Sequence, residues 1–386
     1  MIPYGHQSLS SEDIEEVIKV LKSAFLTQGN AVPMFEKNLC NYTGAKFAVA
    51  VNSGTSALHL ACRAIDLKEN DWLWTTPLSF AASANAALYC NASVDFVDID
   101  PVTNNIDVNK LSEKLRLAGQ TNTLPKVLVP VHLAGLSCEM DEIKKLSKQY
   151  GFFIVEDACH ALGGRYKDIK IGSCQYSDMA VFSFHPVKSI TTGEGGMVMT
   201  NSPSLTEKMR LLRTHGITRD PKLMTKQEPD GPWYYEQIDL GYNYRMNDFQ
   251  AALGSSQLKR LDAFIGKRNK IAKLYNSLFG ELPLQLPATV ETCYSAFHLY
   301  IIRLHLNLIS CSHSQVFSSL LQQGIGVNLH YIPIHLQPYY REMGFKEGDF
   351  PESEKYYREA ITLPIFVDLS SEEIQKVVDS VKRAIQ

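Results

Sequence analysis

The sequence predicts an α/β protein with a large domain followed by a smaller one. Three observations lead to this fold class. Apolar runs of strand length alternate with helix-like periodic segments through the first part of the chain. This alternation ends near Met246, where one long periodic segment begins. A chain of 386 residues also exceeds what a single hydrophobic core normally covers. We therefore expect a large domain over residues 1–240 and a small domain over residues 241–386.

The large domain is expected to hold a mainly parallel sheet, because helices separate its strands. Its clearest strands are residues 71–75, 126–131 and 196–200, and its clearest helices are residues 107–117 and 138–149. In the small domain the periodicity predicts one long helix from residue 249 to about residue 275. Strands over residues 296–304 and two closing helices near Glu352 and Glu372 complete the expected α+β domain.

Composition excludes several other classes of protein. The 38 basic and 41 acidic residues nearly balance, and no dense basic run is present, which argues against a nucleic-acid-binding surface. The eight cysteines form no Cys-x-x-Cys pair, so we expect buried thiols in a reducing compartment. No segment approaches ~20 continuous apolar residues, and the N-terminus does not resemble a signal peptide. We therefore expect a cytoplasmic protein that does not enter the membrane.

The segment after one apolar strand carries a lysine in an unusual place. Residues 178–184 have the pattern of a buried strand, and Lys188 follows that strand. An ammonium group held there would lose hydration at a cost of several kcal/mol unless chemistry uses it. A lysine with a lowered pKa is a competent Schiff-base nucleophile. The same segment also fits a surface lysine in a βα loop, so both interpretations stand at this point.

A second apolar run, residues 152–155, is also followed by polar residues. In open α/β sheets the ligand crevice lies at the carboxyl ends of the strands, so the polar ends of both strands could face one pocket. These ends are Asp157 and His160 from this run, and Ser183 and Lys188 from the other. A carboxylate near such a lysine suits pyridoxal phosphate, because it keeps the pyridine nitrogen protonated. Alternatively, Asp157 could be the N-cap of a following helix.

A third apolar run, residues 47–51, leads into a turn of small residues and then an amphipathic helix. In this turn Gly54 permits close approach, Ser53 and Thr55 supply hydroxyls, and the helix N-terminus favours an anion such as phosphate. The turn equally fits an ordinary N-cap, since no Walker-type or Gly-x-Gly-x-x-Gly motif is present. The turn is significant because of its company along the chain: this turn, Phe80, Asp157 and Lys188 each follow a predicted strand.

In these motifs the chain resembles the DegT/DnrJ/EryC1/StrS family of pyridoxal-phosphate sugar aminotransferases, which have the type I (aspartate aminotransferase-like) fold. The resemblance covers almost the whole chain. Its carriers are Leu-Thr-Gln-Gly at 26–29, Asn-Ser-Gly-Thr-Ser-Ala-Leu at 52–58, Glu-Asp-Ala-Cys-His-Ala at 156–161, Ser-Phe-His-Pro-Val-Lys at 183–188, Gly-Tyr-Asn-Tyr-Arg-Met-Asn at 241–247 and His-Tyr-Ile-Pro-Ile-His at 330–335. It implies an enzyme with pyridoxal 5′-phosphate as its cofactor.

The resemblance also implies roles for individual residues. Lys188 would be the catalytic lysine that carries the cofactor, and Asp157 would be the partner of the pyridine nitrogen. The other implied cofactor contacts are Phe80 on the ring, His160 near the phenolic oxygen, Gly54, Thr55 and Ser183 at the phosphate, and Asn243 from the neighbouring subunit. A contact from the neighbouring subunit implies a homodimer with composite active sites.

Within the family, the resemblance is closest to transaminases of pseudaminic acid biosynthesis, a route that serves flagellin glycosylation. It is carried by residues 79–90, 94–100, 215–221 and 228–236. These enzymes aminate C4 of a UDP-linked 2-acetamido-2,6-dideoxy-4-keto-hexose, by resemblance with L-glutamate as the amino donor. The implied substrate contacts are Tyr4, Ala24, Phe25, Leu26, Thr27, Gly54, His330, Tyr331, Ile332 and Pro333, and Arg245 would clamp the carboxylate of the donor.

Other functions remain open at this point. A sister transaminase could act at C3 or on a dTDP-linked or GDP-linked sugar. A non-catalytic regulatory protein with the same fold is a further alternative, but the chain has no appended DNA-binding segment. Family members that act as dehydratases carry histidine where Lys188 stands, so the lysine argues against dehydration.

Four further features have simpler interpretations. His330 and His335 could suggest a metal pair, but Pro333 breaks any helix between them, so we expect no metal. Trp72 and Trp74 share one face of a strand and are expected in the core. Arg213 and Arg219 fit either a diphosphate contact or a solvated loop. Residues 222–233 are expected to form a long loop that folds over the site of a neighbouring subunit.

Overall fold

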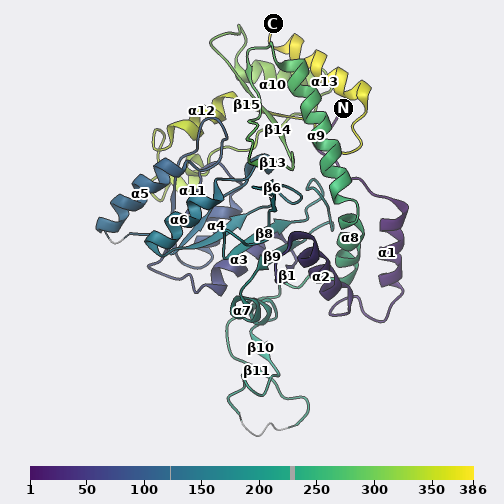
Figure 1. The fold of residues 1–386 in the computed structure, drawn as a ribbon, viewed down its shortest axis with the longest axis vertical. Coiled ribbons are helices and arrows are strands. Elements are labelled where there is room, and N and C mark those ends of the chain that lie inside the picture. Colours follow the sequence, from purple (N-terminus) through teal and green to yellow (C-terminus); the bar gives the residue numbers. More distant parts are fainter. Residues whose placement is uncertain (122, 227–230) are drawn as a thin grey trace.

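A seven-stranded sheet with the order β1-β9-β8-β5-β4-β2-β3 lies at the centre of the computed structural model (Figure 1). The structure describes residues 1–121, 123–226 and 231–386. Its strands are β1 (Phe47–Val51), β2 (Trp72–Thr75), β3 (Ser93–Phe96), β4 (Val127–Val129), β5 (Phe153–Asp157), β8 (Met179–Ser183) and β9 (Gly196–Thr200). Only β9 runs against its neighbours. The carboxyl ends of the other six strands therefore meet at one edge of the sheet.

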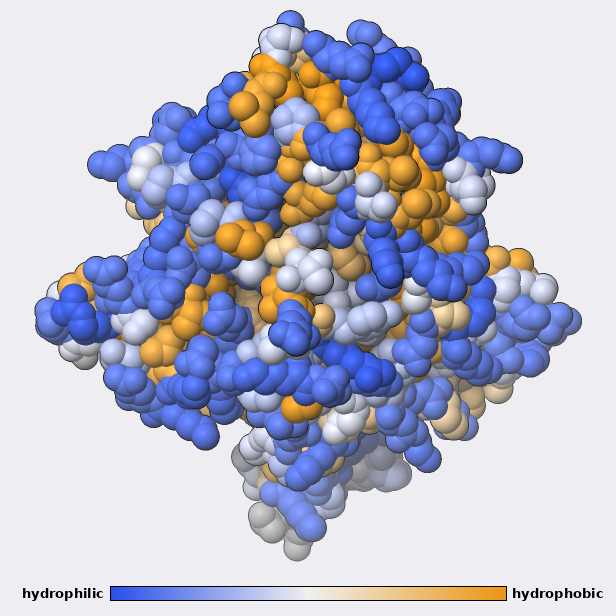
Figure 2. All heavy atoms as spheres, turned by 45° about the horizontal axis from the view of Figure 1, so that its top comes forward, coloured by the Kyte–Doolittle hydropathy of each residue, from blue (hydrophilic) through white to orange (hydrophobic). Residues whose placement is uncertain are grey.

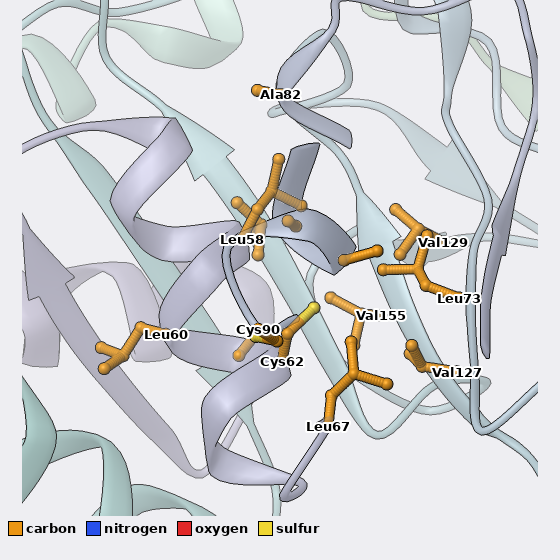
Figure 3. Packing of buried hydrophobic residues seen from close by; sticks show 14 of the residues in the cluster. Leu58, Leu60, Cys62, Leu67, Leu73, Ala82, Cys90, Val127, Val129 and Val155 are labelled. Atoms are coloured by element: carbon orange, nitrogen blue, oxygen red, sulfur yellow. The ribbon is translucent and has the colours of Figure 1, made fainter. Parts of the chain in front are cut away.

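Helices cover both faces of this sheet, because successive side chains of each buried strand point to opposite faces. One face packs against α3 (Gly54–Ala64), α4 (Ala82–Leu88) and α7 (Pro203–Arg213). Figure 3 shows this core, with Leu58 and Cys62 of α3 on one side and Val129 and Val155 of the sheet on the other. The opposite face packs against α2 (Ala31–Thr43), α5 (Val108–Thr121), α6 (Met140–Tyr150) and α8 (Asp248–Leu258). The predicted mainly parallel sheet is confirmed.

A smaller antiparallel sheet forms a second unit beside the first (Figure 1). It consists of β12 (Leu284–Gln285), β14 (Tyr300–Leu304) and β15 (Ala360–Leu363), and it packs with α9 (Leu261–Phe279), α10 (His313–Gln322) and α13 (Ser371–Ala384). The first residues of the chain also lie on this unit, since the amide of Ile2 donates to the carbonyl of Gly324 at 2.8 Å. The N-terminal segment is thereby held where the two units meet.

The remaining elements lie outside these two sheets and the helices that cover them. They are α1 (Ser11–Leu21), β6 (Arg165–Tyr166), β7 (Ile169–Lys170), β10 (Ile217–Thr218), β11 (Glu236–Gln237), β13 (Cys293–Tyr294), α11 (Pro338–Arg341), α12 (Pro351–Glu359) and two 3₁₀ turns, η1 (Leu133–Gly135) and η2 (Ile334–Leu336). Strands β10 and β11 form a hairpin arm that projects from the bottom of the molecule in Figure 1. Part of the loop expected over residues 222–233, and part of the motif at 228–236, lies outside the described residues, which omit 227–230.

The long helix expected over residues 249–275 is wrong, because the structure has two helices there. Helix α8 ends at Leu258 and α9 begins at Leu261. Helix α8 packs against α1 and α2, whereas α9 crosses to the small sheet. Arg260 stays at the junction, where its guanidinium pairs with the buried carboxylate of Asp13 in α1. The division of the chain at residue 240 stays a prediction.

Two further expectations can be compared with the structure. Trp74 is buried and Trp72 packs against the same cluster, which confirms both as core residues. All eight cysteines have free thiols, but only Cys62, Cys90, Cys138 and Cys174 are buried, so the expectation of buried thiols holds for these four alone. Among the described helices, none has the length and apolar character that crossing a bilayer requires.

Candidate active site

A cavity of about 490 Å³ opens at the carboxyl ends of the parallel strands. Its walls come from the ends of β5 and β8, the start of α3, the segment before α4, the N-terminal segment and residues 328–331. Ten of the residues expected at the site line it: Tyr4, Gly54, Thr55, Phe80, Asp157, His160, Ser183, Lys188, His330 and Tyr331. A volume of this size is typical of a cofactor or ligand site.

One wall of the cavity is the N-terminus of α3. The side chain of Ser53 caps this helix by accepting from the amide of Ser56 at 3.1 Å, so the N-cap interpretation is correct. The next two residues, Gly54 and Thr55, line the cavity beside Ser183. A Cβ on Gly54 would lie 2.9 Å from the Cβ of Ser183, which explains why glycine is needed there. A helix N-terminus with adjacent hydroxyls fits the phosphate of the expected cofactor.

The carboxylate of Asp157 lies at the end of β5 and is buried. Its Oδ2 accepts from the hydroxyl of Ser83 at 2.6 Å, and its Oδ1 accepts from the amide of Cys159 at 3.2 Å. No helix follows Asp157, because the described chain continues through turns into β6, so the alternative of a helix N-cap is wrong. A carboxylate held in this way fits the pyridine nitrogen of pyridoxal phosphate.

Lys188 lies in the loop between β8 and β9, where its amide donates to the carbonyl of His185 at 2.9 Å. Burial lowers the pKa of Lys188, and the nearby Cys159 and Asp157 offset part of that effect. No ion pair neutralises its ammonium group within residues 1–121, 123–226 and 231–386. A cavity-lining lysine with a lowered pKa can act as a nucleophile and as a base. The interpretation as an ordinary surface lysine is therefore wrong.

Imidazole and phenol groups form the wall opposite the helix. His160 accepts the amide of Ala134 on Nδ1 at 3.3 Å and lies 3.1 Å through Nε2 from the hydroxyl of Tyr331. Burial lowers the pKa of His160 and His298 well below the usual range, and it lowers the pKa of His330 to about 4. These three side chains are neutral near pH 7, so this wall carries hydrogen-bonding groups without charge.

Two aromatic rings at the cavity belong to segments far apart in the chain. The ring of Tyr4 lies 5.2 Å from that of His330, and the carbonyl of Tyr4 accepts from the amide of Ile365. The ring of Phe80 is 62% exposed and lies 6.1 Å from that of Tyr331. The exposed ring leaves a face on which a flat cofactor can stack.

The other expected contacts lie outside the cavity of their own chain. These are Ala24, Phe25, Leu26, Thr27, Asn243, Arg245, Ile332 and Pro333. Residues 24–27 are exposed and are anchored by the carbonyl of Leu26, which accepts from the amide of Asp248 at 2.9 Å. The side chain of Asn243 is exposed, while its carbonyl oxygen lies 3.4 Å from the side-chain nitrogen of Asn52, just before α3.

Several lining residues were not predicted from the sequence, namely Ser79, Glu194, His298 and Asn328. Ser79 directly precedes Phe80 in the motif at residues 79–90, so the sequence did indicate that it lies near the site. His298 lies before β14, at the amino end of that strand, and the rule for the carboxyl ends of strands does not mark such a position. Nothing local marks Asn328, because its place depends on how the two units meet.

The two histidines and the two arginines with simpler interpretations also have definite places. His335 is fully buried and bonds through Nε2 to Glu354 at 3.0 Å, whereas His330 bonds through Nδ1 to Thr362 at 2.9 Å, so the two histidines serve different partners. Arg213 pairs with Glu36 at 2.7 Å. Arg219 lies over the ring of Tyr235 in the arm. None of the four lines the cavity except His330.

Fold and cavity together define a pyridoxal-phosphate-dependent aminotransferase, because a phosphate-binding helix start, a buried carboxylate and a lysine of lowered pKa surround one cavity. The chain belongs to the DegT/DnrJ/EryC1/StrS aminotransferase family, whose family model matches residues 7–382. This confirms the expected fold class, the enzyme class and the cofactor.

Relatives of the chain carry different names. A UDP-4-amino-4,6-dideoxy-N-acetyl-beta-L-altrosamine transaminase of Campylobacter jejuni is 40% identical over 381 residues, which are 98% of this chain and 96% of the relative. The spore coat polysaccharide biosynthesis protein SpsC of Bacillus subtilis is 37% identical over 388 residues, which are 100% of this chain and 97% of the relative. One name specifies a transaminase of an amino sugar and the other a role in polysaccharide biosynthesis, so the names leave the exact sugar open.

Solved structures agree with this assignment. Helicobacter pylori PseC, an aminotransferase involved in the biosynthesis of pseudoaminic acid, superposes with a TM-score of 0.90 at 34% identity and covers 100% of this chain and 99% of its own. Spr1654 of Streptococcus pneumoniae, in a PMP form and a PLP form, matches with TM-scores of 0.89 and 0.88 at 28% identity, over 100% and 99% of this chain and 99% and 98% of its own. The chain is therefore a sugar aminotransferase with this fold over its full length.

Proposed function

We propose that this sugar aminotransferase transfers the amino group of L-glutamate to C4 of a UDP-linked 2-acetamido-2,6-dideoxy-4-keto-hexose. The products are UDP-4-amino-4,6-dideoxy-N-acetyl-β-L-altrosamine and 2-oxoglutarate, as pseudaminic acid biosynthesis requires. The observation that carries this proposal is the full-length similarity to transaminases named for that product. The similarity to SpsC favours, as a second candidate, a sister reaction on another nucleotide sugar or at C3.

The residues of the cavity supply what amino transfer needs. Bound pyridoxal phosphate provides an electron sink for the carbanion formed at the α-carbon of the donor. Because burial lowers the pKa of Lys188, its amine is more often uncharged than an exposed lysine, and it can take the proton from that α-carbon. The carboxylate of Asp157 would hold a positive charge on the pyridine nitrogen of the cofactor, and the start of α3 would hold its phosphate.

We further propose a homodimer with composite active sites. Asn243 lies beside the start of α3, and its exposed side chain does not line the cavity of its own chain, as expected of a residue near a two-fold axis. No acidic group pairs with Arg245 in the described parts of the chain, which leaves its guanidinium available for a carboxylate.

The projecting arm supports the same proposal. It exposes large apolar side chains, namely Leu223, Trp233, Tyr235, Ile238 and Leu240. The face drawn in Figure 2 is mostly hydrophilic, with apolar side chains gathered in separate patches. Apolar side chains on an extended arm would be covered if the arm packed on a second copy of the chain.

The transfer reaction is tested by following the visible spectrum of the purified holoenzyme. L-Glutamate should bleach the band of the Lys188-bound cofactor, and the UDP-linked 4-keto sugar should restore it. Bleaching without recovery would keep the aminotransferase and reject this sugar, after which dTDP-linked and GDP-linked keto sugars test the second candidate. An unchanged spectrum with glutamate would reject glutamate as the donor.

The composite site is tested by mixing two inactive variants. Lys188→Ala removes the catalytic amine, and Asn243→Asp places a negative charge at the proposed phosphate contact. If Asn243 serves the site of the partner, mixed dimers contain one site with both residues intact, and re-assembled equal mixtures should recover about a quarter of the wild-type activity. No recovery, although native mass measurements show mixed dimers, would place both residues in the same site.

A further inference from the structure

A chain of two buried hydroxyl groups leads to the carboxylate of Asp157. Ser83 lies in α4 and is fully buried, and Ser79 lies four residues earlier, before the helix begins, with 3% exposure. The hydroxyl of Ser79 is 2.7 Å from that of Ser83, which in turn is 2.6 Å from Oδ2 of Asp157. Ser79 lines the cavity, whereas Ser83 does not. Ser83 can therefore act on the cavity only through its neighbours.

The composition of α4 makes Ser83 conspicuous. The buried positions of this helix are otherwise alanines, namely Ala82, Ala84, Ala86 and Ala87. A buried hydroxyl without a partner would destabilise the core, whereas alanine would fit the helix better. The hydroxyl of Ser83 is satisfied only by its two polar neighbours, so its place in the helix is explained by the carboxylate that it contacts.

The direction of both hydrogen bonds follows from the number of protons. An ionised carboxylate only accepts, and a serine hydroxyl has one proton, so Ser83 donates that proton to Asp157. Ser83 must then accept in its contact with Ser79, whose own proton is committed to that contact. Both donors point towards the carboxylate, and such chains strengthen each other by polarisation.

We propose that Ser83, and Ser79 through Ser83, are positioning residues that keep the carboxylate of Asp157 oriented for the pyridine nitrogen of the cofactor. This inference rests on the proposed role of Asp157. The amide of Cys159 holds Oδ1 of the carboxylate and Ser83 holds Oδ2, so the plane of the group is fixed from both sides. Rotation of the carboxylate would require the loss of a charge-assisted hydrogen bond in a buried site.

The proposal is tested on the full-length protein by equilibrium dialysis against pyridoxal phosphate. Ser83→Ala should raise the dissociation constant about 10-fold, the effect of one hydrogen bond to a charged group. Ser79→Ala should have a smaller effect. Because Ser79 acts through Ser83, the double variant should bind the cofactor as weakly as Ser83→Ala alone, and this non-additivity is the signature of a directed chain. Additive effects would overturn it.

Three controls separate this role from packing and from the role of Asp157 itself. Ser83→Cys keeps nearly the same volume with a weak S–H donor, so it should bind the cofactor more weakly than wild type; a wild-type constant would overturn the proposal in favour of packing. Ser147→Ala removes another buried hydroxyl, which donates to the carbonyl of Phe152, and should leave cofactor binding unchanged.

Asp157→Asn completes the test, because it should weaken cofactor binding more than Ser83→Ala does. If Asp157→Asn weakens binding while Ser83→Ala matches wild type, the serine chain is rejected and the role of Asp157 stands. If Asp157→Asn also matches wild type, the proposed role of Asp157 is wrong and this inference falls with it.

Discussion

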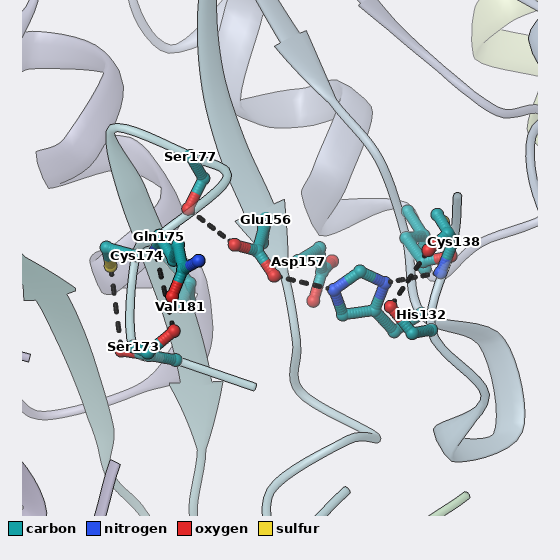
Figure 4. A network of polar contacts seen from close by, with 12 residues as sticks. His132, Cys138, Glu156, Asp157, Ser173, Cys174, Gln175, Ser177 and Val181 are labelled. Carbon is teal, nitrogen blue, oxygen red and sulfur yellow. Dashed lines mark hydrogen bonds and ion pairs between the residues drawn. The ribbon is translucent and has the colours of Figure 1, made fainter. Parts of the chain in front are cut away.

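Two adjacent carboxylates, Glu156 and Asp157, point to opposite faces of β5 and have different surroundings (Figure 4). Both are buried, with 5% and 7% exposure. Glu156 accepts from Nε2 of His132 at 2.8 Å and from the hydroxyl of Ser177. Nδ1 of His132 in turn accepts from the amide of Cys138 at 3.1 Å. Every partner in this network belongs to the folded chain, so Glu156 joins β4, β5 and the turn before β8.

Asp157 has hydrogen-bond donors from the fold on both oxygens, but it also lines the cavity beside Lys188. The two carboxylates share their residue class, their strand and their degree of burial. Asp157 differs from Glu156 in the open volume beside it and in the neighbouring Lys188, which pairs with no acid among the described residues. Burial of a charged group therefore marks a polar network, and only the adjoining cavity marks a site.

The strongest test of the carboxylate and lysine at the cavity is removal of the amine of Lys188. Lys188→Ala should abolish transamination, with a loss of at least about 10²–10⁴-fold, because one side chain both carries the cofactor and moves the proton. The visible band of the lysine-bound cofactor should disappear, while the thermal midpoint of the cofactor-free protein stays near that of wild type. An unchanged band would show that another lysine carries the cofactor.

The comparison itself is tested by removing one charge on each face. Asp157→Asn should lower the rate of both half-reactions about 100-fold, since a neutral amide cannot hold a protonated pyridine nitrogen. Glu156→Gln should lower stability by about 1–3 kcal/mol, because the amide group of glutamine faces one of two buried donors. Stopped-flow spectra and thermal unfolding of both variants measure these effects.

The decisive outcome is that each variant loses one property, activity or stability, and keeps the other. Glu156→Gln should retain most of its activity at a temperature where it is folded, and Asp157→Asn should retain most of its stability. If Glu156→Gln lost activity as severely as Asp157→Asn without unfolding, the two faces would not differ in the way that their contacts indicate.

The sequence was sufficient for the parts of the site that local chemistry determines. Lys188, Asp157 and Gly54 each follow an apolar strand, so the rule for carboxyl ends of parallel strands placed them together. The break between α8 and α9 could not be predicted, because neither proline nor glycine marks it and the helices bend towards different packing partners. The contact of Ser83 with Asp157 joins residues 74 positions apart, and no local pattern encodes it.

The buried histidines at the cavity make the stability of the folded protein depend on pH. His298 at the cavity has no hydrogen-bond partner for Nδ1 among the described residues, and burial lowers its pKa and that of His330. The unfolded chain therefore binds more protons than the folded chain below pH 6.5, so the free energy of unfolding falls as the pH decreases. For His330 this loss ends near pH 4, where its folded pKa lies. Each such group contributes at most about 1.4 kcal/mol per pH unit.

This pH dependence is measured by thermal unfolding of the cofactor-free protein at pH 7 and pH 5. His298→Gln should lose less stability between these values than wild type does. His305→Gln, which changes an exposed histidine of the small unit, is the matched control and should follow the wild type. Equal losses in all three proteins would assign the acid sensitivity to groups outside the cavity.

The smallest expected effect concerns the direction of one hydrogen bond at the cavity wall. Because the amide of Ala134 occupies Nδ1 of neutral His160, the proton of that ring lies on Nε2 and is donated to the hydroxyl of Tyr331. The proton of Tyr331 is then free for an acceptor in the cavity. Burial raises the pKa of Tyr331, so the phenol remains a donor throughout the working range.

Tyr331→Phe should therefore slow the sugar half-reaction by a few-fold to about 10-fold, the effect of one hydrogen bond between neutral groups, and leave the glutamate half-reaction near wild type. Tyr300→Phe removes a matched hydroxyl that contacts Asn276 at 2.7 Å in the small unit, and it should leave both half-reactions unchanged. Stopped-flow spectra separate the two steps. Equal slowing of both half-reactions by Tyr331→Phe would show that the phenol serves the cofactor rather than the sugar. Tyr331 would then share the role of Asp157.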